Sequence, residues 1–254
     1  MRPLQNRLKK QFEAILLETK IEDINNNNSE VLVALKSKTG LEQRDFDQVL
    51  VSVGRIPNTK GLELENTKVR LNNNGFIITD TKQKTDDPYI SAIGDVVGGA
   101  MLAHKASHEA KIAVEVLEGK NTSFNNRIMP AVIFTDPEIA WAGMTETQAR
   151  IEGKEISIAK FPWVASGRAQ SLGRGEGVTK LIIEPKTEKI IGIGLTGSGA
   201  GELVSEGVLA IEIGIKAKDL ALSIHPHPTL SETMMEAAEV FYGTATHIYK
   251  KKRT

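Results

Sequence analysis

The segment 225–232, with the sequence HPHPTLSE, constrains this chain more than any other, because two prolines alternate with two histidines within it. Each proline fixes its own φ and restricts the residue before it, so both imidazoles stand on rigid, extended backbone. A helix is predicted to begin immediately afterwards, with Thr229 as its N-cap. A firmly held His227 close to the carboxylate of Glu232 indicates a site for proton transfer.

Composition narrows the classes of protein to which the chain can belong. Its 254 residues suffice for one large domain or two ordinary ones, and its 32 acidic and 32 basic residues balance, which disfavours nucleic acid and anionic membranes as partners. No apolar run approaches the roughly 20 residues of a membrane span, and the start lacks a signal-peptide core, so a cytoplasmic location is expected. The absence of cysteine excludes disulfides, Cys-based zinc sites and thiol catalysis within this chain.

The first half of the chain is predicted to contain a short helix over 1–12, strands over 13–24 and 30–37 separated by an Asn-rich turn, and a buried strand over 49–53. That last apolar run stops at Gly54. Without a side chain, Gly54 either ends the strand or lets a flat ligand approach the backbone, and the residues alone favour the first interpretation.

A second short strand over 88–96 is predicted to end at Gly94-Asp95, before a helix over 101–117. An acid at the end of a strand is well placed to bind a hydroxylated ligand, although a Gly-Asp turn that caps the next helix is a common alternative. His104 and His108 lie one turn apart on that helix. With no HExxH pattern and no third ligand, packing is favoured over metal binding.

The composition changes at 121–127, and a domain boundary is placed at about 126. From there the pattern is α+β. Strands are predicted over 131–135, 139–143, 155–163, 178–184 and 189–196, and helices over 145–152, 201–213, 217–221 and 229–242. The short link 186–188 predicts a hairpin and hence an antiparallel sheet.

The sequence GIGLTG at 192–197 matches the dinucleotide-binding pattern GxGxxG, and Glu212 follows at the usual distance. We reject this match, because Glu212 falls inside a predicted helix and the preceding strand belongs to a hairpin instead of a βαβ unit. These glycines are expected to let a helix pack closely on the sheet.

Four stretches taken together resemble the dihydrolipoyl dehydrogenase family of pyridine nucleotide-disulfide oxidoreductases. They are VGRIPN at 53–58, AIGDV at 92–96, MLAHKA at 101–106 and HPHPTLSE at 225–232. FTDPE at 134–138 and FPW at 161–163 are similar to the interface domain of that family. The resemblance covers nearly the whole chain.

The resemblance implies a role for each of these segments. Gly54 would lie beside NAD, and Asp95 would bind the ribitol chain of FAD. The segment after it would follow the flavin ring, with Met101, Leu102, Ala103 and His104 as its members. His227 would be the catalytic acid/base, Glu232 its partner and His225 a neighbour in the same site, which would reach the flavin of the other subunit across a two-fold axis.

Glu232 has a competing role, since TxxE at 229–232 is also a capping box. One carboxylate is not expected to serve both duties fully, and the resemblance favours the histidine partner. The chemistry is consistent with it: imidazole, with a pKa of about 6.5, is suited to accept the proton of a thiol whose pKa is about 8.5.

The family also needs an FAD fingerprint, an NAD fingerprint and a cysteine pair, and none is present here. The chain is therefore expected to correspond to the C-terminal half of the enzyme. Residues 1–56 would be the tail of an NAD-binding domain, 57–126 the return segment of an FAD-binding domain, and 127–254 a complete interface domain that forms a homodimer.

For the whole enzyme, the resemblance implies oxidation of protein-bound dihydrolipoamide with NAD as acceptor. Its partner would be the lipoyl-bearing acyltransferase of a 2-oxoacid dehydrogenase complex. Alone, the chain is expected to bind neither FAD nor NAD and to be inactive. The alternative is a dimerisation module without catalysis.

Overall fold

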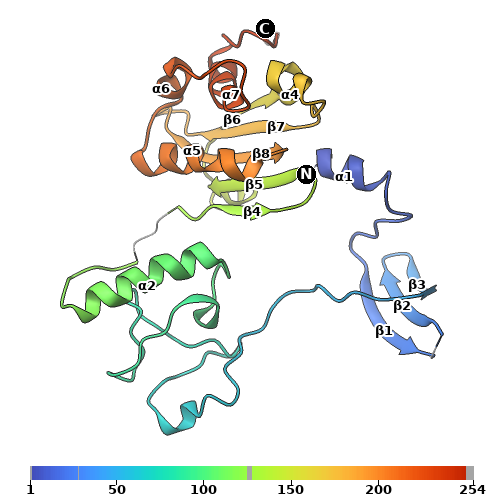
Figure 1. Cartoon of the computed structure of the whole chain (residues 1–254), viewed down its shortest axis with the longest axis vertical. Coiled ribbons are helices and arrows are strands. Elements are labelled where there is room, and N and C mark those ends of the chain that lie inside the picture. Colours follow the sequence, from blue (N-terminus) through green and yellow to red (C-terminus); the bar gives the residue numbers. More distant parts are fainter. Residues whose placement is uncertain (1, 28, 125–127, 250–254) are drawn as a thin grey trace.

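The computed structural model describes residues 2–27, 29–124 and 128–249. Figure 1 shows them as three parts: a small sheet with the labels β1 to β3, an irregular part that carries α2, and a larger part with a second sheet and most of the helices. The predicted boundary near 126 lies outside the described residues. In the described parts, no helix has both the length and the apolar character needed to cross a membrane.

The first part is an antiparallel sheet in the order β1-β2-β3, with β1 at Lys20–Asn26, β2 at Val31–Ser37 and β3 at Gly40–Phe46. A short helix precedes it, α1 at Arg2–Leu8, as predicted. The strand predicted over 13–24 begins only at residue 20 and runs into the Asn-rich segment. Strand β3 was not predicted, because its sequence GLEQRDF is polar and nearly all exposed.

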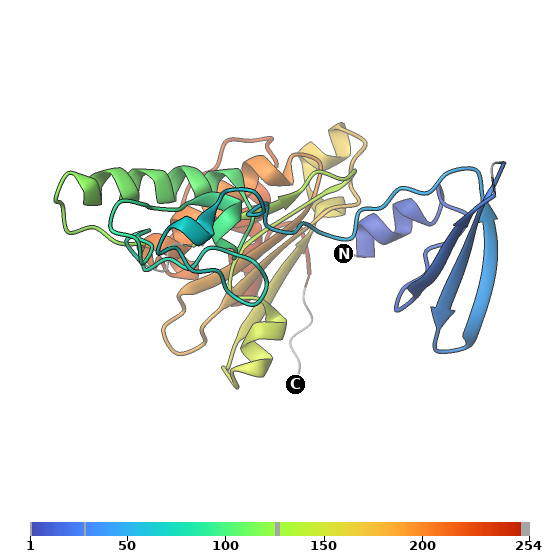
Figure 2. The same ribbon diagram turned by 90° about the horizontal axis from the view of Figure 1, so that it is seen from below.

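The buried strand predicted over 49–53 is wrong. This segment belongs to no strand, and Leu50 and Val53 are 92% and 85% exposed. It forms part of a long, extended link between the first sheet and the second part of the molecule (Figure 2). An apolar run becomes a strand only where other strands bond its backbone and other elements cover its faces, and no described element does so here.

The second part contains the short 3-10 helices η1 (Leu64–Asn66) and η2 (Gly94–Val97) and the helix α2 (Ala103–Leu117). Its core is small, with Val69, Ile77 and Ala92 as the buried members. The strand predicted over 88–96 is reduced to one bridge, between Lys84 and Ser91. No described strand lies alongside to extend the ladder.

The third part confirms the predicted antiparallel α+β pattern. Its strands are β4 (Ala131–Ile133), β5 (Glu138–Gly143), β6 (Ser157–Pro162), β7 (Val178–Ile183) and β8 (Ile190–Gly197), in the order β4-β5-β8-β7-β6. Its helices are α3 (Glu146–Ile151), α4 (Gly167–Ser171), α5 (Ala200–Ile213), α6 (Ala217–Leu222) and α7 (Glu232–Tyr242), and the 3-10 helix η3 spans Trp163–Ala165. Helix α4 was not predicted.

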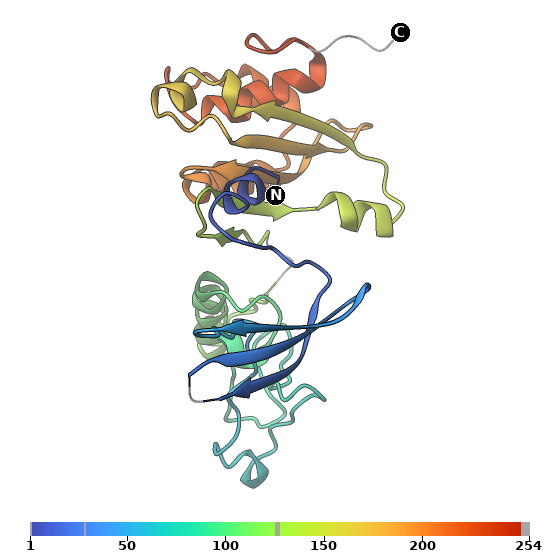
Figure 3. The same cartoon turned by 90° about the vertical axis from the view of Figure 1, so that its right-hand side faces the viewer.

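Packing in this part centres on β7 and β8. Helix α5 packs on β5 and β8, and α7 packs on β6 and β7. Helix α6 packs against α7. One continuous core results, in which Trp163, Leu181 and Met234 are fully buried. Figure 3 shows α1 beside this part, where Arg7 pairs with Asp136 at 2.6 Å.

The glycines of the GxGxxG match lie within β8. A Cβ on Gly192 would overlap the carbonyl oxygen of Met144, and one on Gly197 would overlap the ring of Trp163. These two glycines therefore leave space for the loop at Met144 and for the indole of Trp163. The close packing of a helix on the sheet instead depends on Gly207 of α5, where a Cβ would lie 2.6 Å from Ile193. Glu212 is inside α5, which agrees with rejection of a dinucleotide site.

Candidate functional site

His227 and Glu232 face each other at the start of α7. The His227 Nδ1 lies 2.9 Å from Glu232 Oε1, and the backbone N–H of Thr229 donates to the other oxygen, Oε2, at 2.8 Å. The expectation that one carboxylate cannot serve both duties is wrong, because each oxygen takes one of them. The rigid segment thus presents the histidine with its tautomer set by a carboxylate that is itself held by the backbone.

Thr229 is not the N-cap that the sequence predicted. Helix α7 begins at Glu232, directly after Ser231, and the hydroxyl of Thr229 donates to the carbonyl oxygen of Pro226 at 2.7 Å. Only half of the capping box is formed. The threonine hydroxyl instead closes the turn that carries His227.

The two members of the pair differ in exposure, since the side chain of His227 is 70% exposed and that of Glu232 only 17%. Burial is the largest single influence and would raise the pKa of Glu232. The Thr229 N–H, the hydrogen bond from His227 and the charges of His227 and His247 together outweigh it, and the pKa of Glu232 stays below its usual range. Glu232 is therefore an ionised partner at neutral pH, and Nε2 of His227 is open to a reactant.

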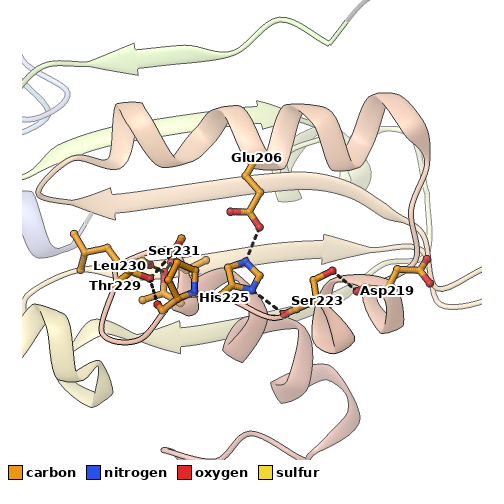
Figure 4. A network of polar contacts seen from close by, with 10 residues as sticks. Glu206, Asp219, Ser223, His225, Thr229, Leu230 and Ser231 are labelled. Atoms are coloured by element: carbon orange, nitrogen blue, oxygen red, sulfur yellow. Dashed lines mark hydrogen bonds and ion pairs between the residues drawn. The ribbon is translucent and has the colours of Figure 1, made fainter.

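His225 is close to this pair in sequence, but its two ring nitrogens contact other residues. Its Nδ1 is 2.9 Å from the carbonyl oxygen of Ser223, and its Nε2 is 2.8 Å from Oε1 of Glu206 on α5 (Figure 4). Its side chain is only 8% exposed. Glu206 was missed by sequence reasoning, because nothing in the spacing of residues 206 and 225 indicates that α5 crosses the histidine segment.

Two of the residues proposed for cofactor binding, Asp95 and Met101, contact Arg55. Its guanidinium pairs with Asp95 at 2.7 Å and also donates to the carbonyl oxygen of Met101. Gly54, next to it, has φ +131° and open space where a Cβ would be. His104, the second residue of α2, has its Nε2 2.9 Å from the carbonyl oxygen of Pro130.

A buried ion pair on α2 bonds the backbone of the Gly94–Asp95 turn. Lys105 and Glu109 are 2.8 Å apart with side chains 9% and 4% exposed, and the N–H of Gly94 donates to Glu109 at 2.7 Å. Neither residue was singled out from the sequence. Their i, i+4 spacing on a helix was the available signal.

The first turn of α2 presents backbone donors, because Leu102 at its N-cap position makes no side-chain capping bond. The half-exposed carboxylate of Asp95 and the N–H groups of the first turn of α2, which have no partner within the helix, suit a ligand that carries both hydroxyl and acceptor groups. The second histidine, His108, packs edge-on against Phe124. Among the described residues, no group of three or more His, Cys, Asp or Glu side chains could hold a metal ion.

The structure does not bring the two clusters together in one chain. Figures 1 and 3 show α2 and α7 in different parts of the molecule. The His227–Glu232 pair and the Arg55–Asp95 cluster are thus two separate groups of residues on the described chain.

Two family models match the chain. The model of the pyridine nucleotide-disulphide oxidoreductases matches residues 2–110, and the model of their dimerisation domain matches residues 129–238. The two matches fall on opposite sides of the predicted boundary near 126, and neither covers 111–124 or 239–249.

Curated relatives with the name dihydrolipoyl dehydrogenase are similar over nearly the whole chain. The protein of Vibrio cholerae is 43% identical over 97% of this chain and 52% of its own length, and that of Geobacillus stearothermophilus is 42% identical over 98% of this chain and 53% of its own. The chain therefore spans about half the length of the curated relatives it matches.

Solved structures agree with this similarity. The HOCl-induced flavoprotein disulfide reductase RclA of Escherichia coli, solved as a Cu(II) complex, superposes with a TM-score of 0.86 at 28% identity. The superposed region comprises 94% of this chain and 54% of the RclA chain. LpdA of Mycobacterium tuberculosis shares the fold, with a TM-score of 0.84 at 24% identity over 94% of this chain and 51% of its own. With both family models, the relatives and the fold in agreement, this chain belongs to the pyridine nucleotide-disulphide oxidoreductase family.

Proposed function

We propose that this chain supplies the acid/base half of a dihydrolipoyl dehydrogenase, which oxidises protein-bound dihydrolipoamide to lipoamide and reduces NAD. The observation that carries the proposal is the His227–Glu232 pair, in which Glu232 bonds the histidine through one oxygen and the backbone through the other. The similarity to curated enzymes with that name supports the choice of substrate.

In the proposed reaction, Nε2 of His227 accepts a proton from a dihydrolipoamide thiol, and the resulting thiolate is the nucleophile. Glu232 holds Nδ1–H and stabilises the imidazolium that forms. His225, fixed by Glu206 and Ser223, keeps the backbone of the segment in place. Because this chain has no cysteine, the disulfide that the thiolate attacks must come from sequence outside these 254 residues.

For the cofactors, we propose that Asp95 binds the ribitol hydroxyls of FAD and that the segment from Met101 to His104 follows its ring. The backbone donors at the start of α2, which the side chain at the N-cap position does not bind, and the half-exposed carboxylate of Asp95 support this assignment. FAD would supply the electron acceptor for the dithiol. Gly54, with open space beside it, is proposed to lie next to NAD.

We further propose that residues 1–56 are the tail of the NAD-binding domain, 57–126 the return segment of the FAD-binding domain and 127–254 the interface domain. The match to a dimerisation domain and the exposed Leu209 and Ile213 on α5 support a homodimer. The lipoyl-bearing acyltransferase of a 2-oxoacid dehydrogenase complex is the proposed partner, and the cytoplasm the proposed location.

The experiment is a chimeric enzyme in which this chain replaces the matching half of the Vibrio cholerae protein. We expect the chimera to reduce NAD with dihydrolipoamide, and the His227→Gln variant to lose about 10²–10⁴-fold in kcat, the usual size of a general acid–base contribution. His108→Gln, which changes a histidine outside the pair, is the matched control and should retain activity. Equal turnover by His227→Gln and the unmodified chimera would contradict the proposal.

The second candidate function is a dimerisation module without catalysis, which is favoured by the compact core of residues 128–249. Both candidates predict that the purified chain shows no flavin absorbance and no NAD reduction. They differ in the chimera, since a mere dimerisation module would restore dimer formation without any turnover that depends on His227.

A further inference from the structure

A row of buried hydrogen bonds connects the core of the third part to the segment that carries His227. The indole N–H of Trp163 donates to Oγ1 of Thr179 on β7 at 2.9 Å, and that oxygen lies 2.7 Å from Oγ1 of Thr233 on α7. Thr233 in turn donates to the carbonyl oxygen of Leu230 at 2.7 Å. All three side chains are fully buried, and the function proposed above makes no use of them.

The chemistry of the four groups fixes the direction of each bond in this row. A carbonyl oxygen only accepts, so Thr233 gives its single hydroxyl hydrogen to Leu230 and must accept a bond from Thr179. The hydroxyl hydrogen of Thr179 is then used, and its oxygen accepts from the indole of Trp163, which only donates. Hydrogen bonds that follow one another in this way in a buried setting strengthen each other, so the row acts as one unit.

The indole of Trp163 is a rigid starting point for the row. A Cβ on Gly177 or on Gly197 would overlap its ring, so two stretches of backbone lie directly against it. The backbone N–H of Trp163 also donates to the carbonyl oxygen of Gly177 at 2.9 Å. The first donor of the row therefore has a single position within the core.

The other end of the row lies at Glu232, because Leu230 and Thr233 flank that residue in the chain. The carbonyl oxygen of Leu230 accepts from both the hydroxyl and the backbone N–H of Thr233, at 2.7 and 3.1 Å. These two bonds close the turn from which α7 begins at Glu232. The same turn sets the direction of the Glu232 carboxylate, which lies between the N–H of Thr229 and Nδ1 of His227.

We propose that Trp163, Thr179 and Thr233 are positioning residues for the His227–Glu232 pair, which they hold in register for proton transfer by tying the first turn of α7 to β7. This proposal rests on the proposed function of His227. Apolar packing is not directional, and side chains of the same shape without hydroxyls would fill the core equally well. Hydrogen bonds require a definite distance and angle, so the row fixes the turn more narrowly than packing does.

The test is NMR spectroscopy of the 254-residue chain with Thr179→Val, which keeps the shape of the side chain and removes its hydroxyl. We expect the amide of Thr229, which donates to Glu232, to exchange with solvent about tenfold faster relative to the core amide of Ile193, the size of one lost hydrogen bond. At about pH 9, where a histidine ring is neutral, Nδ1 of His227 should lose the ¹⁵N signature of a protonated nitrogen, because Glu232 no longer fixes that tautomer. Loss of the same signals in His227→Gln assigns them.

Two further variants are the matched controls. Thr179→Ser keeps the hydroxyl and should preserve both the slow exchange of Thr229 and the Nδ1 signal of His227. Thr196→Val removes a hydroxyl from a buried threonine on the neighbouring strand β8, outside the row, and should also preserve both.

If Thr179→Val does not fold, Thr233→Val removes the next hydroxyl of the row and should produce the same two changes. Unchanged exchange of Thr229 or an unchanged Nδ1 signal of His227 in either folded variant would overturn the proposal, as would equal changes in Thr196→Val. The measurements require neither flavin nor lipoamide, so their outcome is independent of turnover by the chimera, and each proposal can fail alone.

Discussion

Residues 128–249 and residues 2–124 use similar apolar sequence to very different effect. The run at 178–183 becomes β7, paired on both sides and closed over by helices, and Leu181 within it is fully buried. The run at 49–53 is as apolar, yet Leu50 is 92% exposed and unpaired in the described structure. The difference teaches that a strand is made by its neighbours as much as by its own residues.

The sharpest way to break this comparison is to truncate one leucine in each region. Leu181→Ala should cost about 4 kcal/mol of unfolding free energy, because it leaves a cavity in a packed core. Leu50→Ala, the matched control, should change it by less than about 0.5 kcal/mol. Urea unfolding followed by far-UV circular dichroism, which reports on the backbone of both parts, measures both. A large loss with Leu50→Ala would mean that the 49–53 segment is packed in solution.

The next largest effect tests whether residues 2–124 contain any tightly held site. Glu109→Gln leaves Lys105 buried without its partner and should cost about 3 kcal/mol, as for removal of one member of a buried ion pair. The Gly94 amide should then exchange faster with solvent, because Glu109 accepts its hydrogen bond. Glu118→Gln, at the exposed pair with Lys120, is the control. Unchanged exchange at Gly94 would show that this turn needs no support from α2.

The same contrast explains how far the sequence predicts the fold. In residues 128–249, every predicted strand is present, because the hydrophobic pattern and the hairpin signal agree with neighbours that the chain itself supplies. In residues 2–124, the pattern at 49–53 and 88–96 indicates strands whose partners are not among the described residues. The local sequence does not indicate whether such partner strands are present.

The candidate site divides in a similar way. The segment 225–232 contains both His227 and Glu232, so its rigid prolines and short spacing made the pair visible. Glu206 and His247 reach the same region from α5 and from the segment after α7, and Lys105 and Glu109 of α2 bond the backbone of Gly94, next to Asp95. Contacts between distant segments arise from packing, which no spacing rule records.

The smallest effect concerns pH and compares a partly buried acid, Glu232, with an exposed one. Because the folded pKa of Glu232 is lowered, its contribution to stability is complete above the unfolded value of about 4.5 and is lost as the pH falls through the lower folded value. Glu232→Gln should therefore cost about 2 kcal/mol at pH 6, from weakened bonds to His227 and Thr229, and much less at pH 3. Urea unfolding at both pH values measures this difference.

The matched control is Asp86→Asn, because the pKa of Asp86 is also lowered, by its hydrogen bond from Arg70, but at a solvent-exposed position. Water and salt screen such a pair, so this variant should leave the dependence of stability on pH unchanged at 0.5 M salt. If Asp86→Asn flattened the acid limb as much as Glu232→Gln, the exposed region would hold its charges as firmly as the core does. The contrast between the two parts of the chain would then lie in their apolar packing alone.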